Sequence, residues 1–507
     1  MGFSAIDYGV LAIYLVGITI FGSRFRSRHR SVADYFIGGR TTSWWVISLS
    51  IVATETSTLT LIGVPAIAFA AYPRHEQGGN LTYLQVVFGY IVARILIAWL
   101  FIPAYFHGEM LTAYELLNRR FGPRAKHYVA SLFLVMRPLA EGVRVFAASL
   151  VLSAVISATL PAIPHLWVWS VIVVGLLTLI YTFEGGIAAV IWTDLIQLVI
   201  YIGGSLLAAW QLLHLVPGHW PSIAREAAAA GKFQMFSFSF DLSVPFTFWA
   251  GLIGGTFLTM ASHGTDQLLV QRLLACRNTR DAQKAIVLSG LVVLAQFALF
   301  LLIGIMLYAY YQFYPMPSIA SNDEIFPAFI VRSLPHGVSG LVIAAIFAAA
   351  MSNLSGSLNS LASTSVIDFY APLRGGRVEE ARLLRLSRWL TAVWGVVLIG
   401  IALLARGWGS VFTAGLTIAS LVYGPMLGTF LLALLTRRAN ETGALAGITC
   451  SLAFMLFVRL RLPLAWTWYV LVGTAVAFGV GYVVSLAFAP KPRVAQGLSS
   501  ARDHEQP

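Results

Sequence analysis

The residues with the clearest chemical potential interrupt an apolar stretch that runs from Trp44 to Phe69. Its centre reads Ala53-Thr54-Glu55-Thr56-Ser57-Thr58-Leu59-Thr60. A bilayer span needs about 20 mostly apolar residues, and an acidic side chain at its centre costs about 2.5–3.5 kcal/mol on insertion scales. Hydroxyl side chains also compete for backbone hydrogen bonds and weaken a helix. The stretch is either a kinked span with Glu55 paired to a neighbour, or a broken span whose freed carbonyls hold an ion and a solute. We favour the broken span, because non-helical backbone at membrane depth survives where it lines a cavity.

A second polar run interrupts another apolar segment and reads Met351-Ser352-Asn353-Leu354-Ser355-Gly356-Ser357-Leu358-Asn359-Ser360. Ser352 and Ser355 share a helix face, and Ala349 lies one step earlier on it. Asn353 is adjacent and offers an amide oxygen. Na⁺ is a hard cation that prefers oxygen ligands, as Ca²⁺ and Mg²⁺ do. The run therefore either makes helix–helix contacts through its serines or supplies hydroxyls to an ion. No histidine cluster has the spacing of a transition-metal site.

Three charged residues in a further apolar segment, Arg137, Glu141 and Arg144, stand at positions i, i+4 and i+7. This spacing places them on one stripe of a helix. They form either an internal salt-bridged ladder or a set in which one arginine is left over. A leftover guanidinium could take a carboxylate in bidentate geometry. Two cations against one anion is the reason to retain the second alternative.

The composition indicates which elements position these residues. The 507 residues are 58% hydrophobic and 11% charged, whereas a soluble protein is about 25% charged. The chain is therefore an all-α integral membrane protein with many spans. Most Lys and Arg fall in alternate loops, as cytoplasmic loops require, so the net charge of +12 does not indicate nucleic-acid binding. Two cysteines far apart suggest neither a disulfide framework nor a thiolate metal site.

Hydropathy predicts about thirteen spans, with the N-terminus outside and the C-terminus inside. The predicted spans are roughly 5–23, 43–71, 81–106, 128–160, 165–183, 188–216, 244–270, 285–312, 337–366, 389–405, 409–436, 442–460 and 465–488. The polar tail 490–507 is predicted to be disordered and cytoplasmic. We find no acid–base pair, metal ligands or phosphate-binding loop near an interface, so an enzyme is not expected.

The chain resembles the sodium/solute symporter family, which includes the bacterial proline, sialic acid and galactose transporters. Four stretches in family order carry the resemblance: Ala53 to Pro65, YTFEGGIAAVIWTDLIQ at 181–197, HGTDQLLVQRLL at 263–274, and AAAMSNLSGSLNS at 348–360. The resemblance implies a leucine-transporter-like fold of two five-helix inverted repeats, each with a broken first helix. The second break is expected near Ala261 to Gly264.

The resemblance also implies a division of the chain. It places an extra span and a basic cytoplasmic loop at 1–42, the first repeat at 43–216, and an external loop at 217–243. The second repeat then covers 244–437, two C-terminal spans cover 438–489, and the tail follows at 490–507.

The sodium site implied by the family uses the carbonyls of Ala53, Thr56 and Ala349 with side chains of Ser352 and Asn353. Relatives usually have Ser or Thr where Asn353 stands. Glu55 matches an acidic position that supports sodium coupling in the proline branch. Some relatives bind a second sodium with Asp194, Ser352, Ser355 and a further serine, but that further position is Gly356 here. Asp194 therefore joins Ser355 at a second sodium, caps the sixth span, or pairs with an arginine.

For the solute, the resemblance points to residues at and around the broken helices: Ser57, Thr60, Gln85, Arg137, Arg144, Thr259, Ser262 and His263. Sugar-transporting relatives have Gln, Asn and Tyr at several of these positions, whereas this chain has small hydroxyls and arginines. We therefore expect a sodium-coupled symporter in the cell membrane that imports a small carboxylate-bearing solute, such as an amino acid or organic acid, by alternating access.

The alternatives are a proton-coupled or sugar-type symporter of the same fold and, less favoured, a membrane solute sensor. Proton coupling stays open because Glu55 or His263 could carry the proton. The expected partners are the solute, Na⁺ and the lipid bilayer, with no nucleic acid and no obligate protein partner.

Overall fold

The chain folds into a bundle of helices in the computed structural model, which describes residues 3–25, 31–72, 75–108, 110–157, 163–319, 321–375, 378–405 and 411–488. In these ranges the β-structure amounts to one isolated bridge between Thr42 and Cys276. The long helices are α1 (Ala5–Ser23), α3 (Trp44–Glu55), α4 (Thr58–Phe69), α5 (Leu84–Leu96), α8 (Pro123–Ser157), α9 (Leu166–Leu215), α11 (Gly255–Gly264), α13 (Thr279–Phe313), α15 (Val338–Ser363), α17 (Glu380–Leu404), α18 (Val411–Leu435), α19 (Glu441–Arg461) and α20 (Tyr469–Ala487). The shorter helices are α2 (Val32–Ile37), α6 (Ile102–Tyr105), α7 (Glu115–Arg120), α10 (His219–Ala229), α12 (Gln267–Leu274), α14 (Ile325–Ser333) and α16 (Ala371–Leu373).

Within the described residues, nine helices are long and apolar enough to cross a membrane, and the count is ten if α3 and α4 form one span. The all-helical class is therefore confirmed. The count of thirteen spans and the orientation stay predictions.

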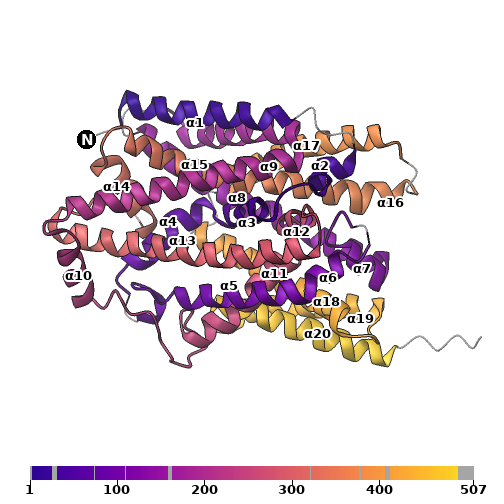
Figure 1. Ribbon diagram of the computed structural model, residues 1–507. Coiled ribbons are helices and arrows are strands. Elements are labelled where there is room, and N and C mark those ends of the chain that lie inside the picture. Colours follow the sequence, from indigo (N-terminus) through magenta and orange to yellow (C-terminus); the bar gives the residue numbers. More distant parts are fainter. Residues whose placement is uncertain are drawn as a thin grey trace, which may run out of the picture.

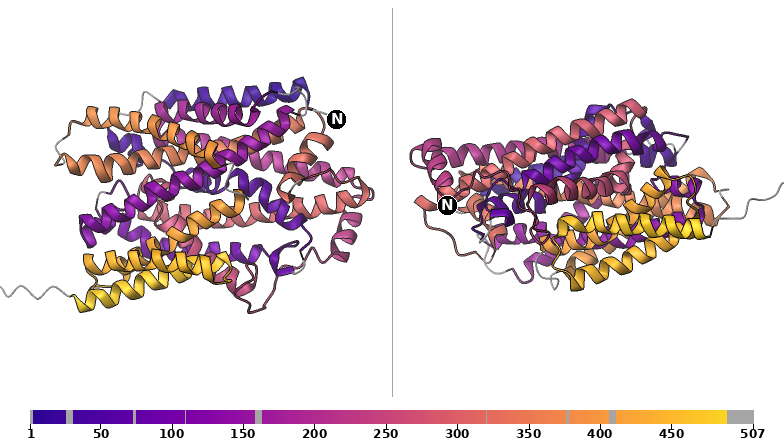
Figure 2. Two further views of the ribbon diagram at one scale, coloured as in Figure 1. Left: turned by 180° about the vertical axis from the view of Figure 1, so that it is seen from behind. Right: turned by 90° about the horizontal axis from the view of Figure 1, so that it is seen from below.

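The two ends of the bundle differ in the way the charge pattern predicts. Figure 1 shows α2, α7 and α16 at one end of the long helices and α10 at the opposite end. The first three belong to or adjoin the basic segments expected in the cytoplasm, and α10 belongs to the expected external loop. Both views in Figure 2 agree with this separation, and α1 and the α19–α20 pair lie at opposite edges of the bundle.

The first broken helix lies where the polar island of the sequence is. Helix α3 ends at Glu55, α4 begins at Thr58, and the two axes meet at 66°. Thr56 and Ser57 have extended ψ angles of 104° and 170°. The Thr60 hydroxyl accepts a 3.3 Å hydrogen bond from the Ser57 backbone N–H, which caps the start of α4. The stretch is therefore a broken span, and the binding of an ion and a solute by its freed carbonyls stays a prediction.

The second break lies one residue beyond the predicted segment. Helix α11 ends at Gly264 and α12 begins at Gln267, so Thr265 and Asp266 form the break. The Asp266 carboxylate accepts a 2.9 Å hydrogen bond from the Leu268 N–H and acts as the N-cap of α12. An acidic N-cap starts a new helix, which explains why the chain breaks at this residue.

The spans predicted at 165–183 and 188–216 are the two parts of α9, Leu166–Phe183 and Gly185–Leu215, which meet at a kink. The structure departs from helical geometry at Gly186, whose φ is 52° and ψ is −158°. A Cβ at this position would lie 2.7 Å from the Tyr35 carbonyl oxygen, so the kink and the close approach of α2 both need glycine. Because one residue makes the turn, no connecting loop is present.

Helix α15 is the most buried of the helices that could span a membrane, with 89% of its apolar window inside the protein. It packs against α9, α1, α8, α3 and α4. Its first turn is held by Asp7 of α1, whose Oδ1 accepts from the N–H groups of Gly337 (2.7 Å) and Gly340 (2.9 Å). Buried Asp7 thus satisfies N–H groups at the start of α15 that have no partner within the helix. The serine-rich helix is held in a fixed position between α1 and the broken α3–α4 pair.

Candidate solute and sodium site

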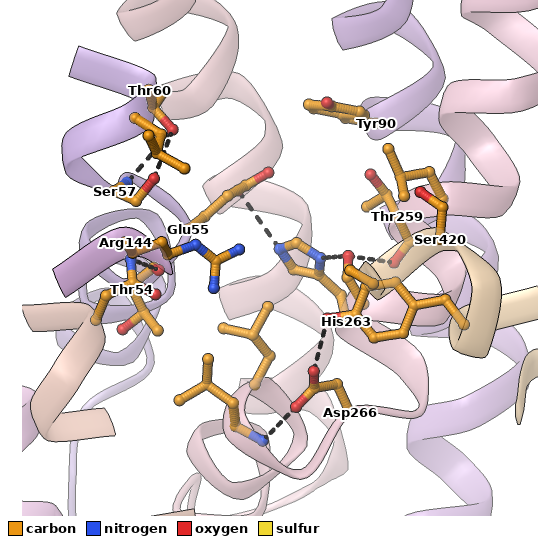
Figure 3. Close-up of a pocket in the computed structure, with 18 of the residues that line it drawn as sticks. Thr54, Glu55, Ser57, Thr60, Tyr90, Arg144, Thr259, His263, Asp266 and Ser420 are labelled. Carbon is orange, nitrogen blue, oxygen red and sulfur yellow. Dashed lines mark hydrogen bonds and ion pairs between the residues drawn. The ribbon is translucent and has the colours of Figure 1, made fainter. Parts of the chain in front are cut away.

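A polar cavity of about 150 Å³ lies between the two broken helices. Its walls come from α3, α4, α5, α8, α11, α12, α13, α15 and α18, and Figure 3 shows many of the lining side chains. Most of the predicted solute residues line it: Ser57, Thr60, Arg137, Arg144, Thr259, Ser262 and His263, together with Glu55 and Asn353. Residues from stretches more than 200 positions apart in the sequence therefore meet in one cavity, as a solute site between two broken helices requires.

Glu55 is not a free carboxylate in this cavity. It forms an ion pair with Arg94 of α5, and its Oε2 lies 3.4 Å from Nε2 of His263 on α11. Arg94 Nη2 lies 3.3 Å from the same histidine nitrogen, and Nδ1 of the ring is 2.8 Å from the Ser262 hydroxyl. Figure 3 shows Glu55 and His263 facing each other across the cavity. The span is therefore broken, and its glutamate is also paired.

Arg137, Glu141 and Arg144 form an internal salt-bridged ladder, the first of the two alternatives that their spacing leaves open. Glu141 Oε2 accepts from Arg137 Nη2 at 3.0 Å and from Arg144 Nη1 at 3.2 Å. The two arginines differ in exposure, since the Arg144 side chain is 21% exposed and that of Arg137 is 4% exposed. Both arginines line the cavity, and Arg144 is the more exposed of the two.

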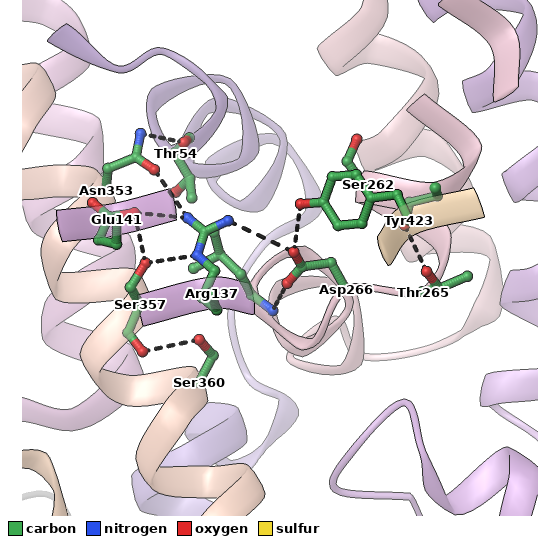
Figure 4. A network of polar contacts seen from close by, with 12 residues as sticks. Thr54, Arg137, Glu141, Ser262, Thr265, Asp266, Asn353, Ser357, Ser360 and Tyr423 are labelled. Atoms are coloured by element: carbon green, nitrogen blue, oxygen red, sulfur yellow. Dashed lines mark hydrogen bonds and ion pairs between the residues drawn. The ribbon is translucent and has the colours of Figure 1, made fainter. Parts of the chain in front are cut away.

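Arg137 holds together helices from both halves of the chain (Figure 4). Its Nε donates to the Ser357 hydroxyl at 3.0 Å and its Nη2 to the Asn353 amide oxygen at 3.2 Å, both on α15. Its Nη1 lies 3.6 Å from Asp266 Oδ2 at the α11–α12 break. The same Asp266 oxygen accepts from the Tyr423 hydroxyl of α18 at 2.7 Å. Arg137 is therefore an internal bridge as well as a cavity residue.

The predicted sodium residues meet where α3 ends against α15. Asn353 Nδ2 donates to the Thr54 carbonyl at 2.7 Å, between Ala53 and Thr56 in the chain. Ala349 and Ser352 are fully buried on α15, and the Thr56 hydroxyl accepts from Gln296 Nε2 at 2.6 Å. The structure thus brings the end of α3 and the serine-rich helix together, as the sequence predicts. The set of oxygens that binds the ion stays a prediction.

Asp194 is engaged on both of its carboxylate oxygens. Oδ1 accepts from the Ser352 hydroxyl at 2.6 Å, and Oδ2 accepts from Ser50 at 2.6 Å and Arg272 Nη2 at 3.0 Å. The pairing of Asp194 with an arginine is therefore confirmed. The Ser355 hydroxyl donates instead to the Ser352 carbonyl at 3.0 Å.

Gln85 is the predicted solute residue that the structure places outside the cavity. Its side chain is fully buried and holds the external loop. Its Nε2 donates to the Phe246 carbonyl at 2.9 Å, and its Oε1 accepts from the Ser237 N–H at 3.0 Å. In this conformation the residue fixes the loop after α10 to the start of α5.

Sequence reasoning missed three residues of the site: Arg94, Ser420 and Tyr423. Arg94 lies within the predicted span 81–106, and the acid Glu55 in a neighbouring span is a signal that a cation must lie nearby. Ser420 and Tyr423 lie in an apolar segment with no polar run to mark them. The Ser420 hydroxyl is buried at the cavity wall and has no hydrogen-bond partner among the described residues, so it is free to bind a solute.

Two broken helices that meet at a buried polar cavity inside an apolar bundle define a membrane transporter. The family model described as "Sodium:solute symporter family" matches residues 35–450. The chain belongs to this family. It is therefore a multi-pass membrane transporter and not an enzyme, and Na⁺ is its coupling ion.

Two characterised relatives show the range of the family. The sodium/sialic acid symporter of Aliivibrio fischeri is 30% identical over 494 residues, which cover 96% of this chain and 94% of the relative. The sodium-coupled monocarboxylate transporter 2 of Bos taurus is 28% identical over 468 residues, which cover 90% and 73%.

Solved structures support the fold. A Na⁺-coupled sialic acid symporter in a substrate-bound, outward-open state superposes with a TM-score of 0.86 at 28% identity, over 96% of this chain and 99% of that one. Mhp1 of the nucleobase-cation-symport-1 family and MhsT superpose with TM-scores of 0.58 and 0.51 at 13% and 14% identity. They cover 91% and 87% of this chain, and 96% and 98% of their own lengths. The last two show the fold alone, which is the leucine-transporter-like fold.

Proposed function

We propose that this symporter imports a small carboxylate-bearing solute together with Na⁺. The observation that supports this proposal is Arg144, a partly exposed guanidinium on the cavity wall. A carboxylate is the group that a guanidinium binds best, through two parallel hydrogen bonds. The unpartnered Ser420 hydroxyl, with Ser57, Thr60, Thr259 and Ser262, supplies hydrogen bonds to the rest of the solute.

The size of the cavity narrows the solute class. A cavity of about 150 Å³ is the size that holds one benzene molecule in an engineered protein core. A sialic acid is several times larger than benzene, whereas a short monocarboxylate or a small amino acid is comparable. In size, the cavity therefore fits a monocarboxylate, the solute class named for the Bos taurus relative, better than a sialic acid, the solute named for the Aliivibrio fischeri relative.

For the ion, the proposal places Na⁺ at the carbonyls of Ala53, Thr56 and Ala349 with the side-chain oxygens of Ser352 and Asn353. The Asn353–Thr54 hydrogen bond supports it, because it keeps α15 against the freed carbonyls of α3. A second Na⁺ at Asp194 and Ser355 stays a prediction. The ion pair between Arg272 and Asp194 argues against this second site, because a second Na⁺ there would lie beside the positive charge of Arg272.

The transport cycle follows from this arrangement. Na⁺ pins the end of α3 to α15 and favours the outward-open state that binds the solute. Solute binding closes the external side, and the predicted repeats 43–216 and 244–437 move relative to each other. The sodium gradient sets the direction of import, and the predicted thirteen spans with the C-terminus inside define which side of the protein is external. The coupling is a difference in affinity between two states.

Uptake by purified protein in proteoliposomes tests the proposal. An inward sodium gradient is expected to drive accumulation of a short monocarboxylate or amino acid from a panel, and a larger sialic acid is expected not to accumulate. Ser352→Ala is expected to raise the sodium concentration for half-maximal uptake. Ser360→Ala is the matched control, since its hydroxyl is also buried on α15 but bonds only the Ser357 carbonyl of its own helix. If no solute of the panel follows the sodium gradient, or if both variants behave alike, the proposal fails.

Co-transport of a proton together with Na⁺ is the second candidate, because the Glu55–His263 contact of 3.4 Å places two titratable groups on the cavity wall. A sodium-driven uptake that rises with an inward proton gradient would support it. A sodium-driven uptake that is unchanged by the proton gradient would exclude it.

A further inference from the structure

The segment between α10 and the helical turn η5 (Ala250–Gly254) is aromatic and almost without charge in its second half. From 233 to 249 it reads FQMFSFSFDLSVPFTFW, in which seven of the 17 residues are aromatic and Asp241 is the one charged residue. Loops in water are normally polar, because apolar side chains gain nothing from contact with water. This composition is therefore not that of an ordinary external loop.

Four apolar side chains of this segment form an exposed row. Phe236, Phe238, Phe240 and Leu242 are 45%, 65%, 74% and 46% exposed, and we call them the apolar row. They stand at every second residue, as side chains on one side of an extended backbone do. The rings of Phe236 and Phe238 stack with their centres 6.0 Å apart. An apolar patch of this kind marks an interaction surface.

The backbone that carries the row is fixed to the rest of the bundle. The Ser237 N–H donates to Gln85 Oε1 of α5 at 3.0 Å, and the Ser237 carbonyl accepts from the Phe248 N–H at 2.7 Å. The Leu242 carbonyl accepts from the Ala465 N–H, just before α20, at 2.9 Å. The row is thus presented by a bonded backbone that is attached to two helices distant in the chain.

The row lies beside the starts of membrane-spanning helices. Two helices that are long and apolar enough to cross a membrane begin next to it, Leu84–Tyr105 and Trp466–Ala487. Figure 1 shows the chain after α10 running along the lower edge of the bundle to the start of α5, whereas α10 itself lies at the end of the bundle. The left view in Figure 2 agrees. The row is therefore at the level where these helices enter the bilayer.

The row also continues a lipid-facing stripe of α5. Val92, Ile95 and Trp99 are 39%, 54% and 75% exposed, and their spacing places them on one face of this helix. An exposed apolar face on a membrane-spanning helix contacts lipid. Phe88 stands one turn earlier on the same face, and its ring stacks on that of Phe236 with centres 6.1 Å apart. The lipid-facing surface of α5 is thus continuous with the apolar row.

We propose that the apolar row is a membrane anchor whose partner is bilayer lipid, at the border between the headgroups and the acyl chains. Aromatic and apolar side chains are favoured at this border. The continuity with α5 favours lipid over a protein partner, because lipid covers the adjoining surface. The predicted external loop 217–243 then has two parts: α10, with its exposed Arg225, faces water, and the apolar row enters the interface. The inference does not depend on the solute or the ion.

The test uses the full-length protein in proteoliposomes, with one reactive cysteine that carries the environment-sensitive fluorophore NBD. Cys450→Ser removes the exposed native cysteine, and the other cysteine, Cys276, is fully buried. The Cys450→Ser protein without a further change is the labelling blank. In this background, Phe238→Cys and Phe240→Cys place the probe in the apolar row.

Two further cysteine variants are the matched controls. Val92→Cys places the probe on the lipid-facing stripe of α5, and Arg225→Cys places it on α10, where the native side chain is 71% exposed. The measurements are the emission wavelength, quenching by iodide in the water, and quenching by lipids that carry a nitroxide on the acyl chain.

Probes at both positions of the row are expected to behave like Val92→Cys. Their emission is expected at a shorter wavelength than that of Arg225→Cys, with quenching by the nitroxide lipid and loss of the iodide quenching. Iodide quenching as strong as in Arg225→Cys would overturn the inference, because the row would lie in water. Protection from iodide without quenching by the nitroxide lipid would also overturn it, since protein, such as a second copy of this chain, would then cover the row. If one of the two variants does not fold, the other decides the result.

Discussion

Arg144 and Arg137 stand on the same stripe of α8 and share Glu141, but the protein uses them differently. Both side chains border the cavity, but that of Arg137 is 4% exposed and contacts Ser357 of α15 and Asp266, whereas that of Arg144 is 21% exposed. The sequence spacing predicts their shared helix face. It does not predict which arginine is enclosed, because that depends on helices far away in the chain.

Replacement of Arg144 tests the solute contact. Arg144→Gln removes a charge-assisted hydrogen bond worth about 1.5–3 kcal/mol, so the KM for solute uptake is expected to rise about 10-fold to 100-fold. Arg144→Lys keeps the charge but loses the bidentate geometry, and a smaller rise is expected. The half-saturating sodium concentration is expected to change little in either variant. Equal KM values for wild type and Arg144→Gln would show that the carboxylate binds elsewhere.

Lys232 shows how a residue after α10 contacts the C-terminal end of α4, the second half of the first broken helix. Its ammonium donates to the carbonyls of Ala68 (3.0 Å), Phe69 (2.8 Å) and Ala70 (2.8 Å) and lies 4.2 Å from the Tyr308 ring centre. A cation at a helix C-terminus is favourable because the last carbonyls lack partners within the helix. Burial nevertheless lowers the pKa of Lys232 to about 8.

This shift predicts a pH dependence of stability. Between pH 8 and the usual lysine pKa of about 10.4, the unfolded chain binds a proton that the folded chain has released. The free energy of unfolding therefore rises with pH across this window, and the cost of burying the charge is fully present below pH 8. Lys232→Met removes the titration. Thermal unfolding from pH 7 to 10 is expected to show a rise in the wild type that the variant lacks, and parallel curves would contradict this assignment.

At the scale of elements, the outer half of the first broken helix packs closely against α13. A Cβ at Gly304 of α13 would overlap the Pro65 carbonyl oxygen and lie 2.9 Å from the Ala68 Cβ of α4. Gly304 thus allows α13 to approach α4 closely at Pro65, where the proline already removes a backbone hydrogen bond from α4. The position of α4, and with it Ser57 and Thr60, depends on this contact.

Gly304→Ala is expected to destabilise the protein by about 1–3 kcal/mol, the usual cost of overpacking. Gly203→Ala on α9 is the matched control, because a Cβ there has no atom within 4 Å. Alanine favours a helix over glycine by about 1 kcal/mol, so the control is expected to be neutral or slightly stabilised. Thermal unfolding of the two variants measures the difference. A Gly304→Ala protein as stable as Gly203→Ala would show that α4 and α13 separate easily.

The sequence predicts the elements better than the contacts between them. The polar island around Glu55 predicts a broken helix because an acid and hydroxyls at the centre of a span are costly. The sequence predicts a break between residues 183 and 188, but it does not predict that a single residue, Gly186, makes it, since this depends on the approach of Tyr35 from another segment. The sequence also does not predict that Gln85 anchors the loop after α10, because the partners of Gln85, Ser237 and Phe246, lie more than 150 residues away in the chain.

At the scale of the whole molecule, the balance of buried charges affects how many Na⁺ ions are transported with each solute molecule. Asp194 is paired with Arg272, so the charge that would attract a second Na⁺ is offset within the protein. Arg272 also occupies the space beside Gly356, where a Cβ would lie 2.7 Å from its Nη2. The oxygen missing at Gly356 and the cation beside it both favour a single Na⁺ per solute.

A single Na⁺ predicts that the uptake of a short monocarboxylate carries no net charge. A membrane potential acts on moved charge with about 2.3 kcal/mol per 100 mV. A potassium diffusion potential, negative inside and set by valinomycin, is therefore expected to leave monocarboxylate uptake unchanged at a fixed sodium gradient. With one Na⁺, a zwitterionic amino acid moves one positive charge, and its accumulation is expected to rise by up to about 50-fold per 100 mV. Potential-driven uptake of the monocarboxylate, with a sodium Hill coefficient near 2, would instead establish the second sodium at Asp194 and Ser355. Asp194→Asn would then be expected to remove the second ion and the response to potential together.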